Sequence, residues 1–304
     1  GFLMFQRFKL AKKQKEVIDE QKNEVEQQKN QIEHQHFQLE ETHKKISDSI
    51  KYAERLQLAI FPSKEDLKKN LGNSFVLFQP KDTVSGDFYW TQNIDGNVYI
   101  ATADCTGHGV PGALVSVVCS NALNRSVKEF HLTKPCEILD KTRELVIETF
   151  SRSGNNVKDG MDITLIKKEA DKITYAGAYN PLWIVRKTAH LTSSESQDRN
   201  NIIQDHLSLL EYKANKQPVG KFENMSAFRE VEIPLKEEDT IYLFTDGFAD
   251  QFGGEFGKKH NRKPFKDYLI EINSLDMTRQ KEAIYNRFID WKGDLEQLDD
   301  VCII

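Results

Sequence analysis

The sequence predicts an α+β protein whose folded domain follows one long N-terminal helix. Three observations carry this prediction. Residues 6–60 contain neither Gly nor Pro and are rich in Gln, Lys and Glu, which is a helical composition. From about residue 71 the chain changes to short β-branched and aromatic runs bounded by Gly, Pro and Asn. The order is strands, two helices, a series of strands, two helices and a last strand, unlike the alternating βαβ order of a Rossmann fold.

Within residues 1–60 the apolar side chains repeat every seven residues, the signal of a left-handed coiled coil. The repeating positions are Met4, Ala11, Ile18, Val25, Ile32, Leu39, Ile46, Ala53 and Ile60. The second core position of each heptad is mostly polar: Gln14, Gln21, Gln28, Gln35, Thr42, Ser49 and Leu56. Such a seam pairs weakly, which suits a signalling helix that switches between two states. We predict a parallel homodimer through residues 1–60. A passive rod and a single solvated helix are the alternatives.

The first residues of the chain allow two interpretations. Gly1-Phe-Leu-Met-Phe is followed by a basic run of Arg7, Lys9, Lys12, Lys13 and Lys15. This segment is either the inner end of a membrane helix followed by its positively charged flank, or simply an apolar helix end or a tag remnant. The first reading would make the chain the cytoplasmic portion of a membrane-anchored protein whose sensor precedes Gly1. No stretch approaches the roughly 20 apolar residues that a membrane helix needs.

Composition excludes other classes of protein. The 304 residues carry 42 Lys and Arg against 47 Asp and Glu, and a net charge of −5 argues against a broad nucleic-acid surface. Eighteen Phe, nine Tyr and three Trp are enough for a packed core. The four cysteines form no C-x-x-C pair, which excludes a cysteine zinc framework and indicates no disulfide scaffold. A reducing, cytoplasmic compartment fits this cysteine usage.

The domain over residues 61–304 is predicted element by element. Pro62 ends the first helix, and Pro111 suits the first turn of the next one. The β-rich runs predict strands at Ser74–Gln79, Asn97–Ala103, Asp162–Lys168, Lys172–Ala178, Leu182–Arg186, Leu207–Tyr212, Ala227–Ile233, Thr240–Phe244 and Val301–Ile304. Helices are predicted at Pro111–Phe130, Pro135–Ser151, Pro264–Asn273 and Thr278–Trp291. The polar, broken segment Thr188–Lys216 reads as a surface excursion around one short strand.

Acidic residues stand where predicted strands end. Asp87, Asp104 and Asp246 each occupy such a position, flanked by glycines (Gly86; Gly107 and Gly109; Gly247), and Asp299 and Asp300 precede the last strand. A carboxylate at the end of a buried strand is costly unless it is paired or bound to a metal. Without a Cys or His cluster, an all-oxygen site suits Mg²⁺ or Mn²⁺. The alternative for any one of them is an ordinary turn aspartate.

These residues lie in ordered motifs that resemble those of the SpoIIE/RsbU-type phosphatases, bacterial members of the metal-dependent PPM (type 2C) serine/threonine phosphatase family. Four of the motifs are Lys81-Asp-Thr-Val-Ser-Gly-Asp-Phe-Tyr, Ala103-Asp-Cys-Thr-Gly-His-Gly-Val-Pro-Gly-Ala, Phe244-Thr-Asp-Gly-Phe and Asp299-Asp-Val. The others are Ala53-Glu-Arg-Leu-Gln-Leu-Ala-Ile-Phe-Pro, Tyr175-Ala-Gly-Ala-Tyr-Asn-Pro-Leu and Lys216-Gln-Pro-Val-Gly. The resemblance covers about residues 53–304.

The resemblance implies a four-layer αββα sandwich with two Mn²⁺ or Mg²⁺ ions at one edge. Asp87 and Asp104 would bridge or flank the metals, and Cys105 would contribute its backbone carbonyl. Asp246 and Asp299 would complete the shell. We choose Asp299 rather than Asp300 as the ligand, a choice left open because adjacent strand residues point to opposite faces. A further carboxylate, Asp162, is not included in the predicted ligand set.

The implied activity is metal-dependent hydrolysis of phosphoserine or phosphothreonine in a protein substrate by a metal-activated water. Asp87, Asp104 and Asp246 would serve this catalysis, and His108 would protonate the leaving alkoxide, unless it is a structural turn histidine. Family relatives often act on phosphorylated STAS-type anti-anti-sigma proteins, which makes that class the expected substrate. The coiled coil would regulate the enzyme. The alternative is a catalytically silent pseudophosphatase or adaptor that binds phosphoproteins in a signalling complex.

Overall fold

The structure, a computed structural model, describes residues 1–151 and 158–304. It divides the chain into two compact units, Gly1–Tyr52 and Ala53–Ile304. The assignment of a signalling helix to residues 1–60 and a phosphatase domain to residues 61–304 stays a prediction. Each unit is described by itself below.

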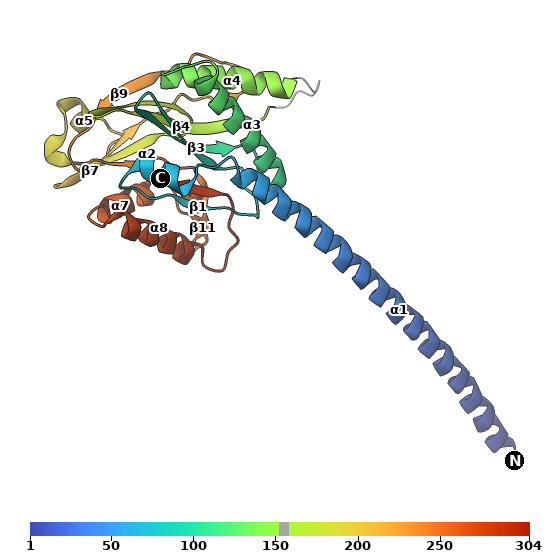
Figure 1. The fold of residues 1–304 in the computed structure, drawn as a ribbon. Helices are drawn as coiled ribbons and strands as arrows, with labels where there is room; N and C mark the ends of the chain where they lie inside the picture. The colour runs from blue at the N-terminus through green and yellow to red at the C-terminus, as the bar shows by residue number, and fades with distance from the viewer. Residues whose placement is uncertain (152–157) are drawn as a thin grey trace. The chain divides into compact units, whose positions relative to one another are not determined.

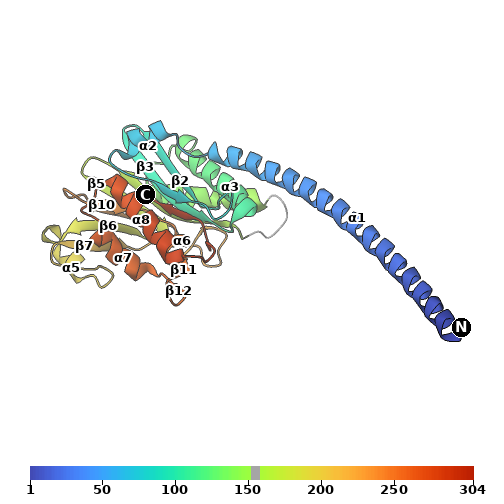
Figure 2. The ribbon, with the colours of Figure 1, turned by 90° about the horizontal axis from the view of Figure 1, so that it is seen from below.

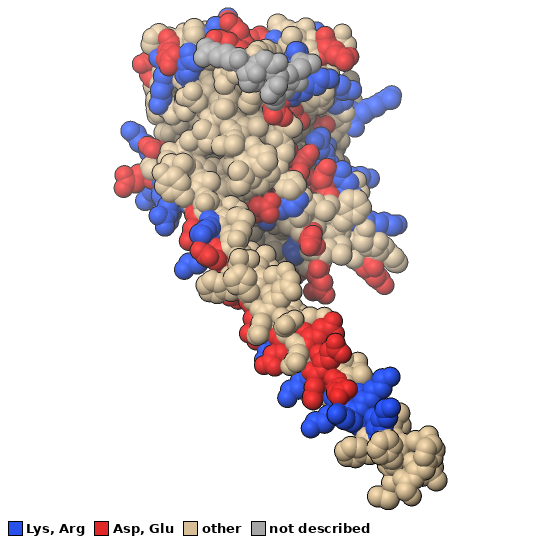
Figure 3. Space-filling view, turned by 90° about the vertical axis from the view of Figure 1, so that its right-hand side faces the viewer, with Lys and Arg blue, Asp and Glu red and all other residues tan. Residues whose placement is uncertain are grey.

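The first unit is one continuous helix, so the predicted long helix is confirmed. Helix α1 spans Phe2–Leu58, and its last turn already belongs to the second unit. In the first unit the apolar heptad side chains are exposed, and Figure 3 shows a band of Lys and Arg next to the uncharged N-terminal tip. No helix within the described residues has an apolar stretch long enough to cross a membrane. Pairing into a coiled coil stays a prediction.

Helix α1 ends earlier than predicted. Beyond Leu58 the chain tightens into a turn in which the Ile60 amide donates to the Gln57 carbonyl and the Phe61 amide to the Leu58 carbonyl. Pro62 lies beyond this turn and therefore does not itself terminate the helix.

The larger sheet of the second unit has six antiparallel strands in the order β2-β3-β4-β5-β9, with β8 paired to β4. Its strands are β2 (Phe88–Ile94), β3 (Asn97–Cys105), β4 (Gly160–Lys168), β5 (Lys172–Ala178), β8 (Val219–Gly220) and β9 (Glu230–Pro234). Strand β2 is missing from the sequence prediction. It forms a hairpin with β3 through Asp95 and Gly96, both at positive φ, which is the two-residue Asp-Gly turn that favours hairpins.

Three smaller sheets complete the strands. The sheet β10-β6-β7 consists of β10 (Thr240–Tyr242), β6 (Leu182–Lys187) and β7 (Leu207–Tyr212), again antiparallel. Strand β1 (Leu77–Gln79) pairs with β13 (Val301–Ile303), and β11 (Phe252–Gly253) pairs with β12 (Lys258–Lys259). Most predicted strands are present, but the first is shorter than the predicted Ser74–Gln79 because pairing with β13 begins at Leu77.

The second unit contains the helices α2 (Lys64–Leu71), α3 (Gly109–Lys128), α4 (Pro135–Ser151), α5 (Ser193–Gln197), α6 (Gly247–Asp250), α7 (Arg262–Glu271) and α8 (Met277–Lys292). Of these, α3, α4, α7 and α8 lie close to predicted helices, and the short helices α2, α5 and α6 were not predicted. Pro111 stands in the first turn of α3, as predicted. Helix α2 is absent from the prediction. Its N-cap Ser63 accepts a hydrogen bond from the Asp66 amide, and Gly72 ends it at positive φ.

Three buried apolar clusters hold these elements together. Helices α3 and α4 pack against the six-stranded sheet through residues such as Trp90, Leu123 and Ile138. The six-stranded and three-stranded sheets share a second cluster that includes Ile166 and Ile184. A third contains Trp183, Phe244, Phe265 and Phe288, from β6, the end of β10, α7 and α8. Figure 1 shows α3 and α4 on one side of the strands and α7 and α8 on the other, and Figure 2, seen from below, shows α7 and α8 in front of the strands. The α+β class is confirmed, and the full four-layer order stays a prediction.

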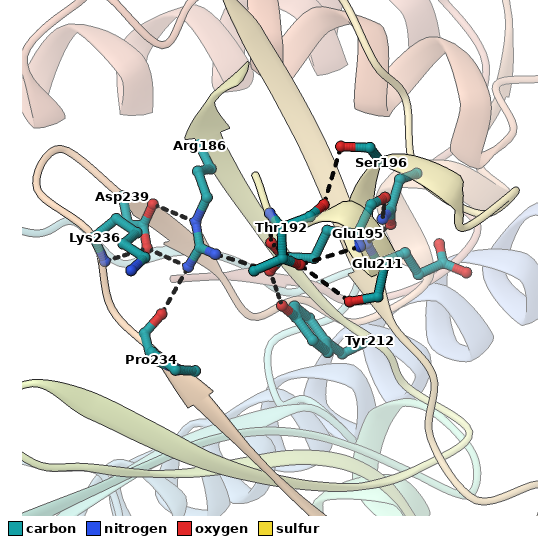
Figure 4. A network of polar contacts seen from close by, with 11 residues as sticks. Arg186, Thr192, Glu195, Ser196, Glu211, Tyr212, Pro234, Lys236 and Asp239 are labelled. Carbon is teal, nitrogen blue, oxygen red and sulfur yellow. Dashed lines mark hydrogen bonds and ion pairs between the residues drawn. The ribbon is translucent and has the colours of Figure 1, made fainter. Parts of the chain in front are cut away.

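The buried Arg186 fixes part of the polar segment Thr188–Lys216 after β6, which the sequence predicts to be an irregular surface segment around one short strand. The Arg186 guanidinium, 1% exposed, donates to both carboxylate oxygens of Asp239 at 2.9 and 2.7 Å. It also donates to Glu195 on α5 at 2.8 Å and to the Pro234 carbonyl at 2.8 Å (Figure 4). Glu195 in turn accepts from the Tyr212 hydroxyl at 3.0 Å. The network ties α5 to β7, β9 and the turn before β10.

Candidate active site

The four predicted aspartates come from four separate chain segments and meet in one cluster. Asp87 precedes β2, Asp104 lies near the end of β3, Asp246 caps α6, and Asp299 precedes β13. Burial raises the pKa of Asp104 well above its ordinary value, and the neighbouring carboxylates of Asp87, Asp246 and Asp299 raise it further. Burial likewise raises the pKa of Asp87, where the hydrogen bond from Thr245 opposes the effect and the other carboxylates add to it. Each carboxylate therefore sits within the field of the others.

Close glycine contacts bring the segments together. A Cβ on Gly86 would stand 2.3 Å from the Gly107 carbonyl oxygen, and one on Gly112 would stand 2.1 Å from the same oxygen. Both distances are far below contact, so these positions require glycine. A Cβ on Gly247 would stand 2.0 Å from the Asp300 carbonyl oxygen. The motif glycines thus pack the Asp87 loop against the Asp104 loop, and Asp246 against the Asp299 segment.

Asp87 is held by a hydroxyl from another strand end. Its side chain is 1% exposed and accepts a hydrogen bond of 2.6 Å from the Thr245 hydroxyl. The same hydroxyl accepts from the Cys302 amide at 2.9 Å. This chain of contacts fixes one oxygen of Asp87 relative to the start of α6 and to β13.

Asp299 and Asp300 have different surroundings. The buried Asp300 carboxylate accepts from the Lys81 amide and from the Gly86 amide, both at 2.8 Å, so both of its oxygens are engaged in holding the 81–86 loop. Asp299 instead lines a pocket of about 250 Å³ together with Asp104 and His108. One oxygen of Asp299 accepts from the Asp300 amide at 2.9 Å, and the choice of Asp299 as the ligand stays a prediction.

Asp162 belongs to this cluster, although the predicted ligand set omits it. It pairs in register with Asp104 on the neighbouring antiparallel strand and lines the pockets that contain Asp104 and Asp246. Burial raises its pKa to about 7, with a further contribution from Asp246. The sequence places Asp162 near the start of a buried strand, but only the pairing of β4 with β3 brings it opposite Asp104.

His108 lies at the rim of the cluster rather than inside it. Its Nδ1 is 3.1 Å from the Asp82 carboxylate, and its Nε2 is 3.2 Å from the Lys81 ammonium. The side chain is about half exposed. Asp82 therefore orients the ring, and the second ring nitrogen faces a cation at the mouth of the pocket that contains Asp104 and Asp299.

The chemistry of the donor set fits hard cations. Among the ion pairs of the described residues, none involves Asp87, Asp104, Asp246 or Asp299. Arg262 and Lys259 act on Asp246 only from a greater distance, where their charges oppose the rise in its pKa that burial causes. The Cys105 side chain is buried in the apolar cluster under α3, which leaves its backbone carbonyl as its donor. Within the described residues, however, no three His, Cys, Asp or Glu side chains already stand close enough together to hold a metal ion. Metal ligation by these residues stays a prediction.

Comparisons with known proteins show the family of the chain. The family model described as Stage II sporulation protein E (SpoIIE) matches residues 94–304, more than half of the chain. The SiaA-PP2C domain of Pseudomonas aeruginosa is similar in structure, with a TM-score of 0.72 and 29% identity over 86% of this chain and 96% of that one. No curated protein matches the chain.

More distant structures share the fold. The RsbU and RsbW domains of Rv1364c from Mycobacterium tuberculosis give a TM-score of 0.55 at 16% identity, over 75% of this chain and 57% of that one. The PP2C phosphatase domain and regulatory fragment of SpoIIE from Bacillus subtilis give 0.54 at 14% identity, over 75% and 60%. The chain therefore belongs to the SpoIIE family, the SpoIIE/RsbU type of PPM phosphatase.

Proposed function

We propose that the chain is a metal-dependent phosphatase that hydrolyses phosphoserine and phosphothreonine in a protein substrate. The observation that carries the proposal is the meeting of four strand-end aspartates in one cluster, with Asp87 buried and the other three half-buried, none of which forms an ion pair among the described residues. The free-energy cost of holding several carboxylates together away from water is smallest when bound cations compensate their negative charge. Membership of the SpoIIE family supports the same conclusion.

The cluster would hold two Mn²⁺ or Mg²⁺ ions through Asp87, Asp104, Asp246, Asp299 and the Cys105 carbonyl. When bound, the ions would supply an activated water and neutralise charge on the phosphoryl group. Thr245 keeps Asp87 in place, and Asp300 holds the loop that carries it. His108, whose ring contacts Asp82, would give a proton to the departing serine or threonine oxygen.

We further propose that residues 1–60 regulate the domain as a parallel homodimer. The last turn of α1 is part of the second unit, where the buried Gln57 side chain accepts from the Ser85 amide at 3.1 Å and donates to the Ser85 carbonyl. It also donates to the Ser116 hydroxyl on α3 at 3.0 Å. Ser85 lies two residues before Asp87. A change in the packing of α1 would therefore reach both the Asp87 loop and α3.

The substrate that we propose is a phosphorylated STAS-type protein. The proposed compartment is the cytoplasm. The proposed upstream element is a membrane-anchored sensor before Gly1. The RsbU and RsbW domains among the similar structures support a place in phosphoprotein signalling.

The first experiment is hydrolysis of p-nitrophenyl phosphate by the intact chain and by Asp246→Ala, with Mn²⁺ and with EDTA. We expect activity that requires Mn²⁺ and disappears in the variant. Activity of Asp246→Ala equal to that of the unaltered chain would contradict the proposed site. If the intact chain is inactive, the assay is repeated without residues 1–45. A chain that gains activity on this deletion is an autoinhibited enzyme, and one that stays inactive is a pseudophosphatase.

If the helix regulates the domain, removing residues 1–45 should change the activity or the oligomeric state. If both properties stayed the same in an active protein, the proposed regulation would be wrong.

A further inference from the structure

A second pocket adjoins the acidic cluster and differs from it in charge. It has a volume of about 470 Å³, and Asp162 and Asp246 of the cluster form part of its wall. Lys213, Lys216 and Arg262 line the same pocket. The pocket therefore joins the proposed phosphate-hydrolysing end to a basic end.

The three cations form no ion pair within the part of the chain that is described, although Arg262 lies near enough to Asp162 and Asp246 for its charge to oppose the rise that burial causes in the pKa of both carboxyls. Lys213, Lys216 and Arg262 are exposed, and none of them forms an ion pair with another described residue. Glu211, the other acidic residue of the pocket wall, is already bound to the Lys266 ammonium at 2.5 Å and to the Trp183 indole nitrogen at 3.0 Å. The charges of Lys213 and Lys216 therefore remain available to an acidic ligand, whereas Arg262 also acts on Asp162 and Asp246 of the cluster.

The backbone under this basic end is fixed. Tyr179, a non-glycine residue at φ 54°, donates its amide to the Asn215 carbonyl at 2.9 Å, and the Asn215 amide donates to the Gly177 carbonyl at 2.9 Å. The Asn215 side chain also accepts from the Arg229 amide at 3.1 Å. A positive φ at tyrosine is strained and persists only where surrounding contacts impose it. The segment between Lys213 and Lys216 is thus anchored to the end of β5, beside the acidic cluster.

We propose that this pocket binds acidic side chains that flank the phosphorylated residue of the protein substrate. The inference rests on the proposed phosphatase function and adds a substrate class to it: phosphoserine or phosphothreonine with nearby Glu or Asp. The phosphoryl group would lie at the Asp162 and Asp246 end, and the flanking carboxylates would meet Lys213, Lys216 and Arg262. Charge complementarity of this kind gives specificity as well as affinity.

The test compares two phosphoserine peptides that differ only in flanking residues, Glu in one and Gln in the other. The proteins are the intact chain, the double variant Lys213→Glu/Lys216→Glu, and the control Lys263→Glu. Lys263 is also an exposed lysine, is on α7 next to Arg262 in sequence, and is not part of the pocket wall. Thermal unfolding of each protein checks that the variants are folded.

For the intact chain with Mn²⁺ we expect kcat/KM for the Glu peptide to exceed that for the Gln peptide by about tenfold, as two or three exposed ion pairs would give. The ratio should fall to about one or below in the double variant, stay about tenfold in Lys263→Glu, and shrink at high salt. Equal kcat/KM for both peptides in the intact chain would overturn the inference, as would an equal loss of preference in Lys263→Glu.

A binding measurement separates this inference from the proposed function. Fluorescence anisotropy of the labelled peptides gives Kd without turnover. If the intact chain hydrolyses neither peptide but binds the Glu peptide more tightly, and the double variant loses that preference, the proposed function fails and the pocket stands. If the intact chain binds both peptides equally, the pocket inference fails, whether or not the peptides are hydrolysed.

Discussion

Replacing Arg186 by Met should destabilise the domain severely. The guanidinium is 1% exposed and the side chain of its partner Asp239 is 3% exposed, so the substitution leaves a buried carboxylate without its cation. It also removes the contacts to Glu195 and to the Pro234 carbonyl. Breaking a buried ion pair on one side costs about 3–5 kcal/mol, compared with at most about 1 kcal/mol for a surface pair.

Urea unfolding followed by circular dichroism measures this cost. We expect the midpoint to fall with an unchanged slope, because the surface exposed on unfolding stays the same. Arg229→Met is the matched control, since Arg229 is exposed and has no ion pair among the described residues. It should change stability by no more than about 0.5 kcal/mol. A loss of less than about 1 kcal/mol for Arg186→Met would refute the reasoning, because it would mean that water already solvates the network.

Three further predictions concern the candidate site. Without metal, folding raises the pKa of Asp162 from 3.8 to about 7, so the folded protein binds this proton more tightly than the unfolded chain. The stability that proton binding contributes is therefore complete below pH 4 and is lost as the pH rises through 7. In EDTA at pH 8 the free energy of unfolding of Asp162→Asn should therefore exceed that of the unaltered chain by at most about 4 kcal/mol. If the difference in free energy of unfolding between the two proteins were the same at pH 4 and at pH 8, this prediction would be contradicted. Gln57→Ala leaves the Ser85 amide without its partner and should cost about 1–3 kcal/mol in urea unfolding and lower phosphatase activity. Gln27→Ala, at an exposed position of α1 outside the two heptad core positions, should change neither. Mn²⁺ should raise the thermal midpoint of the intact chain by mass action but not that of Asp246→Ala, and an equal rise in both would argue against the cluster as the metal site.

The sequence predicted those elements whose pattern is local. Pro135–Ser151, Lys172–Ala178 and Leu207–Tyr212 have their predicted bounds, because each has a complete apolar pattern between clear breaks. The meeting of the aspartates was also predictable, since each motif places its carboxylate at a strand end. Strand β2 and helix α2 were missed although the Asp95-Gly96 turn and the Ser63 cap signal them.

Other features depend on pairing that no local pattern encodes. Asp162 joins the cluster only because β4 runs antiparallel to β3 in a register that places it opposite Asp104. Arg186 looks like the polar end of a strand in the sequence. It becomes buried because Asp239, Glu195 and the Pro234 carbonyl arrive from three other segments.

The anchoring of the 81–86 loop by Asp300 has a consequence for how the protein is made. The Asp300 carboxylate accepts hydrogen bonds from the amides of Lys81 and Gly86, which lie more than 200 residues earlier in the chain. Strand β1 likewise has β13, at the end of the chain, as its pairing partner. During synthesis Asp87 and Asp104 leave the ribosome long before the residues that fix their loop. A nascent chain therefore cannot assemble the site until β13 has emerged, so translation itself delays the appearance of activity.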